Sequence, residues 1–391
     1  MPTDVKRVYL DYNATAPLMP EALDAALPYY TLRWGNASSI HRVGREARLA
    51  VEEAREQVAQ LLGVANPLDI VFTSNGTEAI NLALRGYAWA NRARGKHLVT
   101  TMAEHPAVLD TCQALQQQGF DVTYVPVDGQ GCVDPDTLAN AIRPDTLLVS
   151  VIHGNHEVGT LQPLAELVNA THARGVVMHV DATQAVGRVE IDVRALGVDL
   201  LSLSGHKFGG PKGVGALYVH DGLGANMAAV IHGGHQERER RGGTEDVPSL
   251  VALGRACALM RSRLVDEAKR LASLRDHLEC EVLARLARAR ILGSGSARLP
   301  NTSNVSFLGV KGEALVFNLD LLGIAVSTGA SCTSRRGAPS QVLDAMGVSR
   351  AESEGSVRFS LGWATTEDDI AQVITVLPGV IERLRMLSPL E

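Results

Sequence analysis

The chain has 391 residues, of which 46% are hydrophobic, 20% are charged and only 4% are aromatic. This composition excludes a disordered protein, and the formal net charge of -6 argues against a nucleic-acid-binding surface. The length exceeds what one hydrophobic core usually supports, so we expect a large domain and a smaller one.

The first residues, MPTDVKRVYLDY, lack the basic and apolar segments of a signal peptide, and no apolar run approaches the ~20 residues of a membrane helix. The five cysteines show no CxxC spacing and fit neither a disulfide framework nor a structural zinc site. They are Cys112, Cys132, Cys257, Cys280 and Cys332. We therefore expect a cytoplasmic protein with reduced thiols, without a membrane partner and without direct nucleic-acid binding.

Short apolar, β-branched runs recur between longer helical patterns. They predict strands at 69–74, 97–101, 121–127, 147–153, 176–182, 200–205 and 215–219. Helical spacing lies between them, for example over 44–63 and 76–95. This alternation predicts an α/β fold with a mostly parallel seven-stranded sheet.

A helical pattern continues from about 248 to 292, and it predicts a connecting helix that leads into a second domain. The rest of the chain has shorter strands and helices in mixed order, which indicates an α+β domain. We predict a large domain over 17–262 and a small domain formed by 1–16 and 263–391.

Polar and titratable residues follow several of the predicted strands. Ligands of open α/β sheets bind at the carboxyl ends of the strands, so we expect these residues to lie together. In chain order they are Gly76, Thr77, His105, Asn155, His156, Asp181, Gln184, Ser204, His206 and Lys207. Taken singly, each has an ordinary alternative role, such as a helix cap, a loop histidine or a solvated lysine.

Together these residue types match the needs of pyridoxal phosphate. A lysine amine forms a Schiff base with its aldehyde, and a carboxylate keeps its pyridine nitrogen protonated. We predict Lys207 and Asp181 for these two tasks; the rival Lys212 follows a proline in a turn instead of ending a strand. The other predicted contacts are the ring face with His105, the ring hydroxyl with Gln184, and the phosphate with Gly76, Thr77, Ser204 and His206.

Other ligand classes fit the glycine-rich segments poorly. The strand-to-helix turns carry no GxGxxG, and GPKGVGALY leads into a strand, so neither a dinucleotide fingerprint nor a Walker loop is present. His232 and His235 have no third ligand in the sequence nearby, so we predict no metal site.

The chain resembles the NifS/IscS-type cysteine desulfurases, which are fold-type-I pyridoxal phosphate enzymes of the class-V aminotransferase family. The matching segments follow the family order over nearly the whole chain. They are YLDYNATAP, GNASSIH, FTSNGTEAINLA, EHPAVLDTC, HVDATQAVG, SGHKFGGPKGVGALYV, HGG, RGGT, TGASCTS and VRFSLG.

The resemblance implies an enzyme that converts L-cysteine to L-alanine and leaves a persulfide on Cys332 for a sulfur-acceptor protein. It makes Lys207, Cys332 and His105 catalytic, and Arg358 the residue that holds the substrate carboxylate. Thr244 would reach the phosphate of a second subunit, which implies a homodimer. Arg335 and Arg336 beside Cys332 would favour its thiolate form.

Two departures from the family pattern affect these expectations. Where the family has Asn-Asn-Glu, this chain has Asn155, His156 and Glu157, so an imidazole that titrates near neutral pH replaces an amide beside cofactor and substrate. The chain also ends at LSPLE, short of the tail with which housekeeping members dock an iron–sulfur scaffold. We therefore expect one of two destinations for the sulfur: iron–sulfur cluster assembly, or a specialised acceptor, including one for tRNA or DNA sulfur modification.

Two kinds of alternative remain. One is a selenocysteine lyase or an aminotransferase of the same fold, neither of which needs a thiol in a loop. The other is a non-catalytic assembly protein that retains the fold, although the presence of Lys207, Asp181, His105 and Cys332 argues against it.

Overall fold

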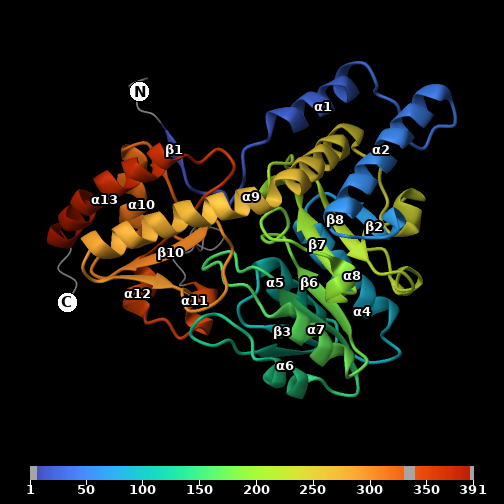
Figure 1. Cartoon of the computed structure of the whole chain (residues 1–391). Coiled ribbons are helices and arrows are strands. Elements are labelled where there is room, and N and C mark those ends of the chain that lie inside the picture. The colour runs from blue at the N-terminus through green and yellow to red at the C-terminus, as the bar shows by residue number, and fades with distance from the viewer. Residues whose placement is uncertain (1–6, 330–339, 388–391) are drawn as a thin grey trace.

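The computed structural model describes residues 7–329 and 340–387 (Figure 1). Its largest sheet has seven strands in the order β2-β8-β7-β6-β5-β3-β4. The strands are β2 (Ile70–Thr73), β3 (His97–Thr101), β4 (Asp121–Val125), β5 (Thr146–Ile152), β6 (Val177–Asp181), β7 (Leu200–Ser204) and β8 (Gly215–Val219). All neighbours pair in parallel except β8, which is antiparallel to β2 and β7. The predicted mostly parallel sheet is therefore confirmed.

Helices cover both faces of this sheet, which explains why the strands read as continuous apolar runs. Alternate strand residues enter opposite cores: Val180 and Leu201 face one, while Leu148 and Leu200 face the other. The helices of this part are α2 (Arg42–Leu61), α3 (Gly76–Asn81), α4 (Tyr87–Ala90), α5 (Pro106–Gln117), α6 (Pro135–Ala141), α7 (Leu164–His172) and α8 (Val193–Leu196). A π-helical segment, Leu82–Gly86, joins α3 to α4, so the helix predicted over 76–95 ends at Ala90.

The long helix α9 (Val247–Arg285) connects two cores, as Figure 1 shows in gold. Its residues up to Met260 pack in the core of the large sheet with α2 and α1 (Pro20–Thr31), and its residues from Leu271 enter a second core. The predicted domain boundary after residue 262 falls in this interval and stays a prediction. The predicted extension of this helix to 292 is wrong, because the chain leaves the helix at Leu286 and pairs as strand β9 (Ala289–Leu292).

The second core lies around a three-stranded antiparallel sheet in the order β12-β10-β9. Its other strands are β10 (Thr302–Phe307) and β12 (Ser356–Ser360), and its helices are α10 (Gly312–Leu321), α11 (Gln341–Ala345), α12 (Arg350–Glu354) and α13 (Glu367–Leu387). The N-terminal strand β1 (Val8–Tyr9) pairs in parallel with β11 (Ile324–Ala325). The chain therefore begins beside its C-terminal part and then passes to the large sheet.

Candidate active site

The predicted site residues lie where the carboxyl ends of three neighbouring parallel strands meet. Asp181 is the last residue of β6 and is 2% exposed; it pairs in register with Ile152 of β5 and Ser202 of β7. Its Oδ1 accepts the N–H of Thr183 at 2.9 Å, which braces the turn after the strand. This turn engages only Oδ1, which leaves the second carboxylate oxygen of Asp181 for a ligand or for another hydrogen-bond partner.

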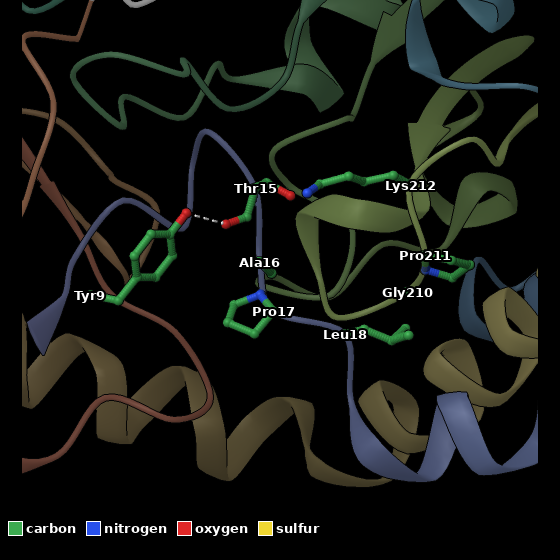
Figure 2. A pocket seen from close by; sticks show the side chains of 8 residues that line it. All are labelled: Tyr9, Thr15, Ala16, Pro17, Leu18, Gly210, Pro211 and Lys212. Atoms are coloured by element: carbon green, nitrogen blue, oxygen red, sulfur yellow. Dashed lines mark hydrogen bonds between the residues drawn. The ribbon is translucent and has the colours of Figure 1, made fainter. Parts of the chain in front are cut away.

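Lys207 follows β7 directly, at the end of the short helix Gly205–Lys207. Its Nζ donates to the carbonyl oxygens of Asn13 at 2.6 Å and Ala14 at 3.0 Å, so the N-terminal segment holds the amine. Lys212, by contrast, is exposed, and its side chain extends across a separate pocket toward Thr15 (Figure 2). The structure therefore favours Lys207 over Lys212 as the inward-facing amine.

Two imidazole rings meet beside this lysine. His105, ahead of α5, and His156 form an edge-to-face pair with ring centroids 5.1 Å apart. The N–H of Ala107 donates to Nδ1 of His105 at 3.0 Å, so the neutral ring carries its proton on Nε2. Burial lowers the pKa of His105, with the charge of Lys207 acting in the same direction and that of Asp181 opposing it. A flat neutral ring is what stacking on a cofactor requires.

His156 does not provide the neutral-pH titration that the sequence suggests. Burial, and then the nearby His105, Arg358 and Lys207, hold its pKa well below the ordinary value. Its Nδ1 is buried without a hydrogen-bond partner among residues 7–329 and 340–387. It thus acts as a neutral polar group, as the asparagine it replaces would.

Asn155 braces the loop between β5 and the small sheet. Its Nδ2 donates to the carbonyl of Ala103 at 3.0 Å, and its Oδ1 accepts the N–H groups of Glu157 and Val158. Both ends of the amide are bonded to backbone. Its predicted contact with substrate stays a prediction.

Arg358 reaches the site from the middle of β12, a strand of the small sheet. Its Nη2 donates to Asp11 Oδ1 at 2.7 Å, and its Nη1 donates to the carbonyls of His156 at 2.9 Å and Gly329 at 3.3 Å. The buried Nε has no partner within the described parts of the chain. A guanidinium fixed on one edge and open at Nε suits a carboxylate ligand. The sequence analysis missed Asp11, whose only signal is its place in YLDYNATAP.

A group of hydroxyls near α3 suits a phosphate. Ser204 Oγ and Thr183 Oγ1 are buried and find no hydrogen-bond partner in the described residues. A Cβ on Gly76 would lie 3.0 Å from Thr183 Oγ1 and 3.2 Å from Ser204 Cβ, so glycine leaves the space between them open. Thr77 is exposed at the start of the same helix. Thr183 is a second residue that the sequence analysis missed, although it stands in the HVDATQAVG segment.

The other predicted cofactor contacts are placed in different ways. Burial, and then Lys207, Lys212 and Arg188, lower the pKa of His206 to about 4, so this ring is neutral, and its Nδ1 lies 3.1 Å from Thr15 Oγ1. Gln184 is 4% exposed, and its Nε2 donates to the Asn13 carbonyl at 2.9 Å. Thr244 lines a separate groove with Tyr30 and Trp34.

Cys332, Arg335 and Arg336 lie outside the described residues. The described residues on either side are held at the site: Gly329 by Arg358, and Ser340 by a 2.6 Å bond from its Oγ to Glu157 Oε2. Of the other cysteines, Cys112 and Cys257 are buried, and Cys280 is exposed on α9. Burial raises the pKa of Cys112 to about 12, so that thiol is a poor nucleophile.

The described ranges, 7–329 and 340–387, hold neither a metal-binding cluster nor a helix that could span a membrane. They contain no group of three or more His, Cys, Asp or Glu side chains that could hold a metal ion. His235 instead lies 2.7 Å from Glu239 on the surface. Over the same ranges, no helix has the length and apolar character to cross a membrane.

Comparison with known proteins gives one consistent answer. The family model Aminotransferase class-V matches residues 8–373. A relative named cysteine desulfurase IscS, from Dictyoglomus turgidum, is 46% identical over 384 residues, which cover 98% of this chain and 97% of the relative. A solved structure titled NifS-like protein has a TM-score of 0.91 at 38% identity, covering 97% of this chain and all of that one. Another, titled SspA in complex with cysteine, has a TM-score of 0.81 at 34% identity, covering 90% and 98%.

The predicted resemblance and fold class are thus confirmed: the architecture is that of the NifS-like, fold-type-I pyridoxal phosphate proteins. The individual roles assigned to site residues stay predictions. By its sequence and its fold, the chain belongs to the class-V aminotransferase family.

Proposed function

We propose that this protein is a pyridoxal phosphate-dependent cysteine desulfurase that converts L-cysteine to L-alanine and holds the released sulfur as a persulfide on Cys332. The observation that carries this proposal is the placement of Lys207 and Asp181 at the ends of the adjacent strands β7 and β6, with neutral His105 beside them. The relatives named cysteine desulfurase and the solved structure titled as a cysteine complex support the choice of substrate.

The residues present fit this cofactor. Ser204 and Thr183 offer two buried hydroxyls without partners in the described structure, as a phosphate requires. Asp181 offers a buried carboxylate for the ring nitrogen, and Lys207 an amine held only 2.6 Å from a carbonyl oxygen. When bound, pyridoxal phosphate supplies an aldehyde for amines and a cationic ring that withdraws electrons from the substrate Cα.

The side chains of this chain then have distinct tasks. Arg358 binds the substrate carboxylate through its open Nε edge, and this fixes the position of Cα. Lys207 takes and returns the proton at Cα, because its amine is the inward-facing base of the site, held by the Asn13 carbonyl beside His105. His105 covers the ring face and excludes water, and its Nε2–H is available to the substrate sulfur.

Cys332 takes the sulfur atom. One sulfur moves from the substrate Cβ to the Cys332 thiol, so the thiol becomes a persulfide, cysteine becomes alanine, and no external oxidant or reductant is needed. The thiolate is the attacking form, and Arg335 and Arg336 are proposed to favour it.

Two variants test the proposal. Borohydride should fix the cofactor to the wild type, and Lys207→Ala should lose this label. Cys332→Ala should keep the cofactor absorbance but form no persulfide, whereas the control Cys280→Ala, at an exposed cysteine of α9, should form it normally. Continued persulfide formation in Cys332→Ala would exclude Cys332 as the nucleophile. A colourless wild-type protein that borohydride does not label would exclude the proposed enzymatic function.

We further propose a homodimer, formed through the helices α1 and α2. Large apolar side chains are exposed on α1 and in the loop between α1 and α2, notably Tyr30 at 62%, Trp34 at 72% and Ile40 at 90%. Thr244 lines a groove with Tyr30 and Trp34, as expected of a residue that reaches a second subunit. Light scattering should give twice the chain mass for the wild type, and the chain mass for Trp34→Glu; a monomeric wild type contradicts this.

We propose a sulfur-acceptor protein as partner and the cytoplasm as location. Four thiols of the described chain are free, which fits a reducing compartment. The acceptor serves either iron–sulfur cluster assembly or the sulfur modification of tRNA or DNA. Incubation of the persulfidated enzyme with candidate acceptors, followed by mass analysis of acceptor cysteines, separates these outcomes.

A further inference from the structure

Arg188 is a buried guanidinium in the turn that follows β6. It is 6% exposed, and its Nη1 donates to the carbonyl of Gln184 at 3.1 Å and to the side-chain Oε1 of the same residue. Its Nη2 donates to the carbonyls of Lys207 at 3.2 Å and Tyr12 at 3.3 Å. No carboxylate of residues 7–329 and 340–387 forms an ion pair with it, unlike the buried Arg55, which is paired with Glu237.

Burying a cation without an acid is costly, so this side chain needs a local reason. Burial, and then repulsion from Arg358, lower the pKa of Arg188 to about 9, which still leaves it charged at neutral pH. An apolar side chain of similar volume would fill the space at lower cost in stability. Packing alone therefore does not account for an arginine here, and its role lies in the hydrogen bonds of its guanidinium.

The bond to Gln184 settles which way its amide points. A guanidinium only donates hydrogen bonds, so the atom of Gln184 that faces Arg188 must be the oxygen. The nitrogen then faces the site. One of its two N–H groups donates to the Asn13 carbonyl, and an amide nitrogen has a second N–H that can donate to a ligand.

The other end of Arg188 holds the segments that carry the lysine. Lys207 is bonded through its own carbonyl, and Tyr12 precedes the two residues, Asn13 and Ala14, whose carbonyls hold Nζ. Gly187 makes this arrangement possible: its φ is +76°, and a Cβ there would lie 2.7 Å from Phe208 Cβ.

We propose that Arg188 is a positioning residue that fixes the Gln184 amide with its N–H toward the ring oxygen of the cofactor, and fixes the turn that bears Lys207. This inference rests on the proposed function, since it assumes that pyridoxal phosphate binds here. Arg188 acts through Gln184 and Lys207, to which its guanidinium donates hydrogen bonds.

A double-mutant cycle on cofactor binding tests the inference. Arg188→Met and Gln184→Ala should each weaken pyridoxal phosphate binding by about 10-fold, the effect of one lost hydrogen bond to a polar ligand atom. The double variant should be weaker by clearly less than the product of the two, because both changes remove the same contact. Arg188→Met should also alter the visible circular dichroism of the bound cofactor, and Arg188→Lys should restore part of it.

Arg275→Met is the matched control, since Arg275 is also a buried arginine, 9% exposed, that donates to a carbonyl, that of Leu299. It should lower the melting temperature without changing cofactor affinity or the visible spectrum. If Arg188→Met does not fold, Arg188→Lys carries the test, because it keeps the charge and loses the fork. The inference is overturned if the losses of cofactor affinity in the two single variants multiply in the double variant. It is also overturned if the Arg188 variants keep the affinity and the circular dichroism of the wild type. In either case, a wild type that borohydride labels leaves the proposed function unaffected.

Discussion

The two sheets contribute to the site in different ways. The seven-stranded sheet presents Asp181, Lys207 and the residues around them at strand ends, on turns and short helices. The three-stranded sheet presents Arg358 from the middle of β12, where Ser327 and Asn304 pair with it on either side. The turn after a strand can present several side chains of different chemistry. The middle of a paired strand presents one side chain, in a rigid position. We therefore expect the large sheet to provide the reactive groups and the small sheet a fixed anchor.

The N-terminal segment joins these regions. Asn13 donates from its backbone N–H to Ser360 Oγ at 3.0 Å and from its Nδ2 to Thr302 Oγ1 at 2.9 Å, both in the small sheet. Its carbonyl accepts from Lys207 and Gln184 on the large sheet. A shift of one sheet against the other would therefore break bonds at this single residue.

The largest effect is expected from Asp181→Asn, at the end of β6. Loss of the charged partner of the ring nitrogen should lower kcat by about 100-fold with the cofactor still bound, since hydrogen bonds to charged groups contribute ~1.5–3 kcal/mol. Steady-state alanine release measures it. Asp192→Asn is the control, because the carboxylate of Asp192 caps the short helix α8 through the N–H groups of Arg194 and Ala195. Equal losses in both variants would show that Asp181 is merely a cap.

A smaller, differently distributed effect is expected from Arg358→Lys in the middle of β12. The ammonium keeps the charge but loses the planar fork, so KM for cysteine should rise by about 10-fold with little change in kcat. Arg290→Lys, in strand β9 at the opposite edge of the same sheet and paired with Glu352 on the surface, should change KM less than about twofold. If Arg358→Lys instead lowers kcat at constant KM, Arg358 of the small sheet does not anchor the substrate carboxylate.

The strand-end residues could be predicted from sequence, and the residues between the sheets could not. Asp181, His105 and Lys207 each follow a recognisable apolar run, and parallel strands bring such positions to one edge. Asp11 and Asn13 follow a two-residue strand whose partner, β11, lies more than three hundred residues along the chain, and no local pattern encodes that pairing. Arg188 has no sequence signal either, because a buried arginine and a surface one read alike until the fold is known.

His156 lies between the two regions, since its carbonyl accepts from both Arg358 and Asn13. Burial, and then the nearby His105, Arg358 and Lys207, hold its pKa well below the ordinary value, so we expect the ring to be neutral at neutral pH. His156→Asn should therefore change kcat by less than about threefold, the effect of one neutral hydrogen bond, and leave the shape of the pH profile between 6 and 9 unchanged. Loss of one limb of the profile in the variant would mean that His156 titrates.

A separate effect, on stability instead of activity, is expected at the end of β3. Glu104 is 1% exposed; its Oε1 accepts from Thr101 Oγ1 at 2.7 Å and from the N–H of Ile152 at 2.9 Å, which ties β3 to β5 beside Asp181. Its Oε2 has no partner within the described ranges. Burial raises the pKa of Glu104 to about 8, and the charge of Asp181 adds to this. The folded protein thus holds this group as the neutral acid at neutral pH.

A carboxyl group whose folded pKa exceeds its unfolded value stabilises the protein fully below the unfolded pKa, and this stability is lost as pH rises through the folded pKa. The window here runs from about 4.5 to about 8. Glu104→Gln mimics the protonated acid without titrating, so the free energy of unfolding of the wild type should fall relative to the variant by ~1 kcal/mol per pH unit across it. Urea denaturation at pH 5, 6.5 and 8 measures this difference, with Glu46→Gln, an exposed partner of Arg42, as control. Parallel curves would mean that Glu104 is ionised, and that the end of β3 tolerates a second buried negative charge beside Asp181.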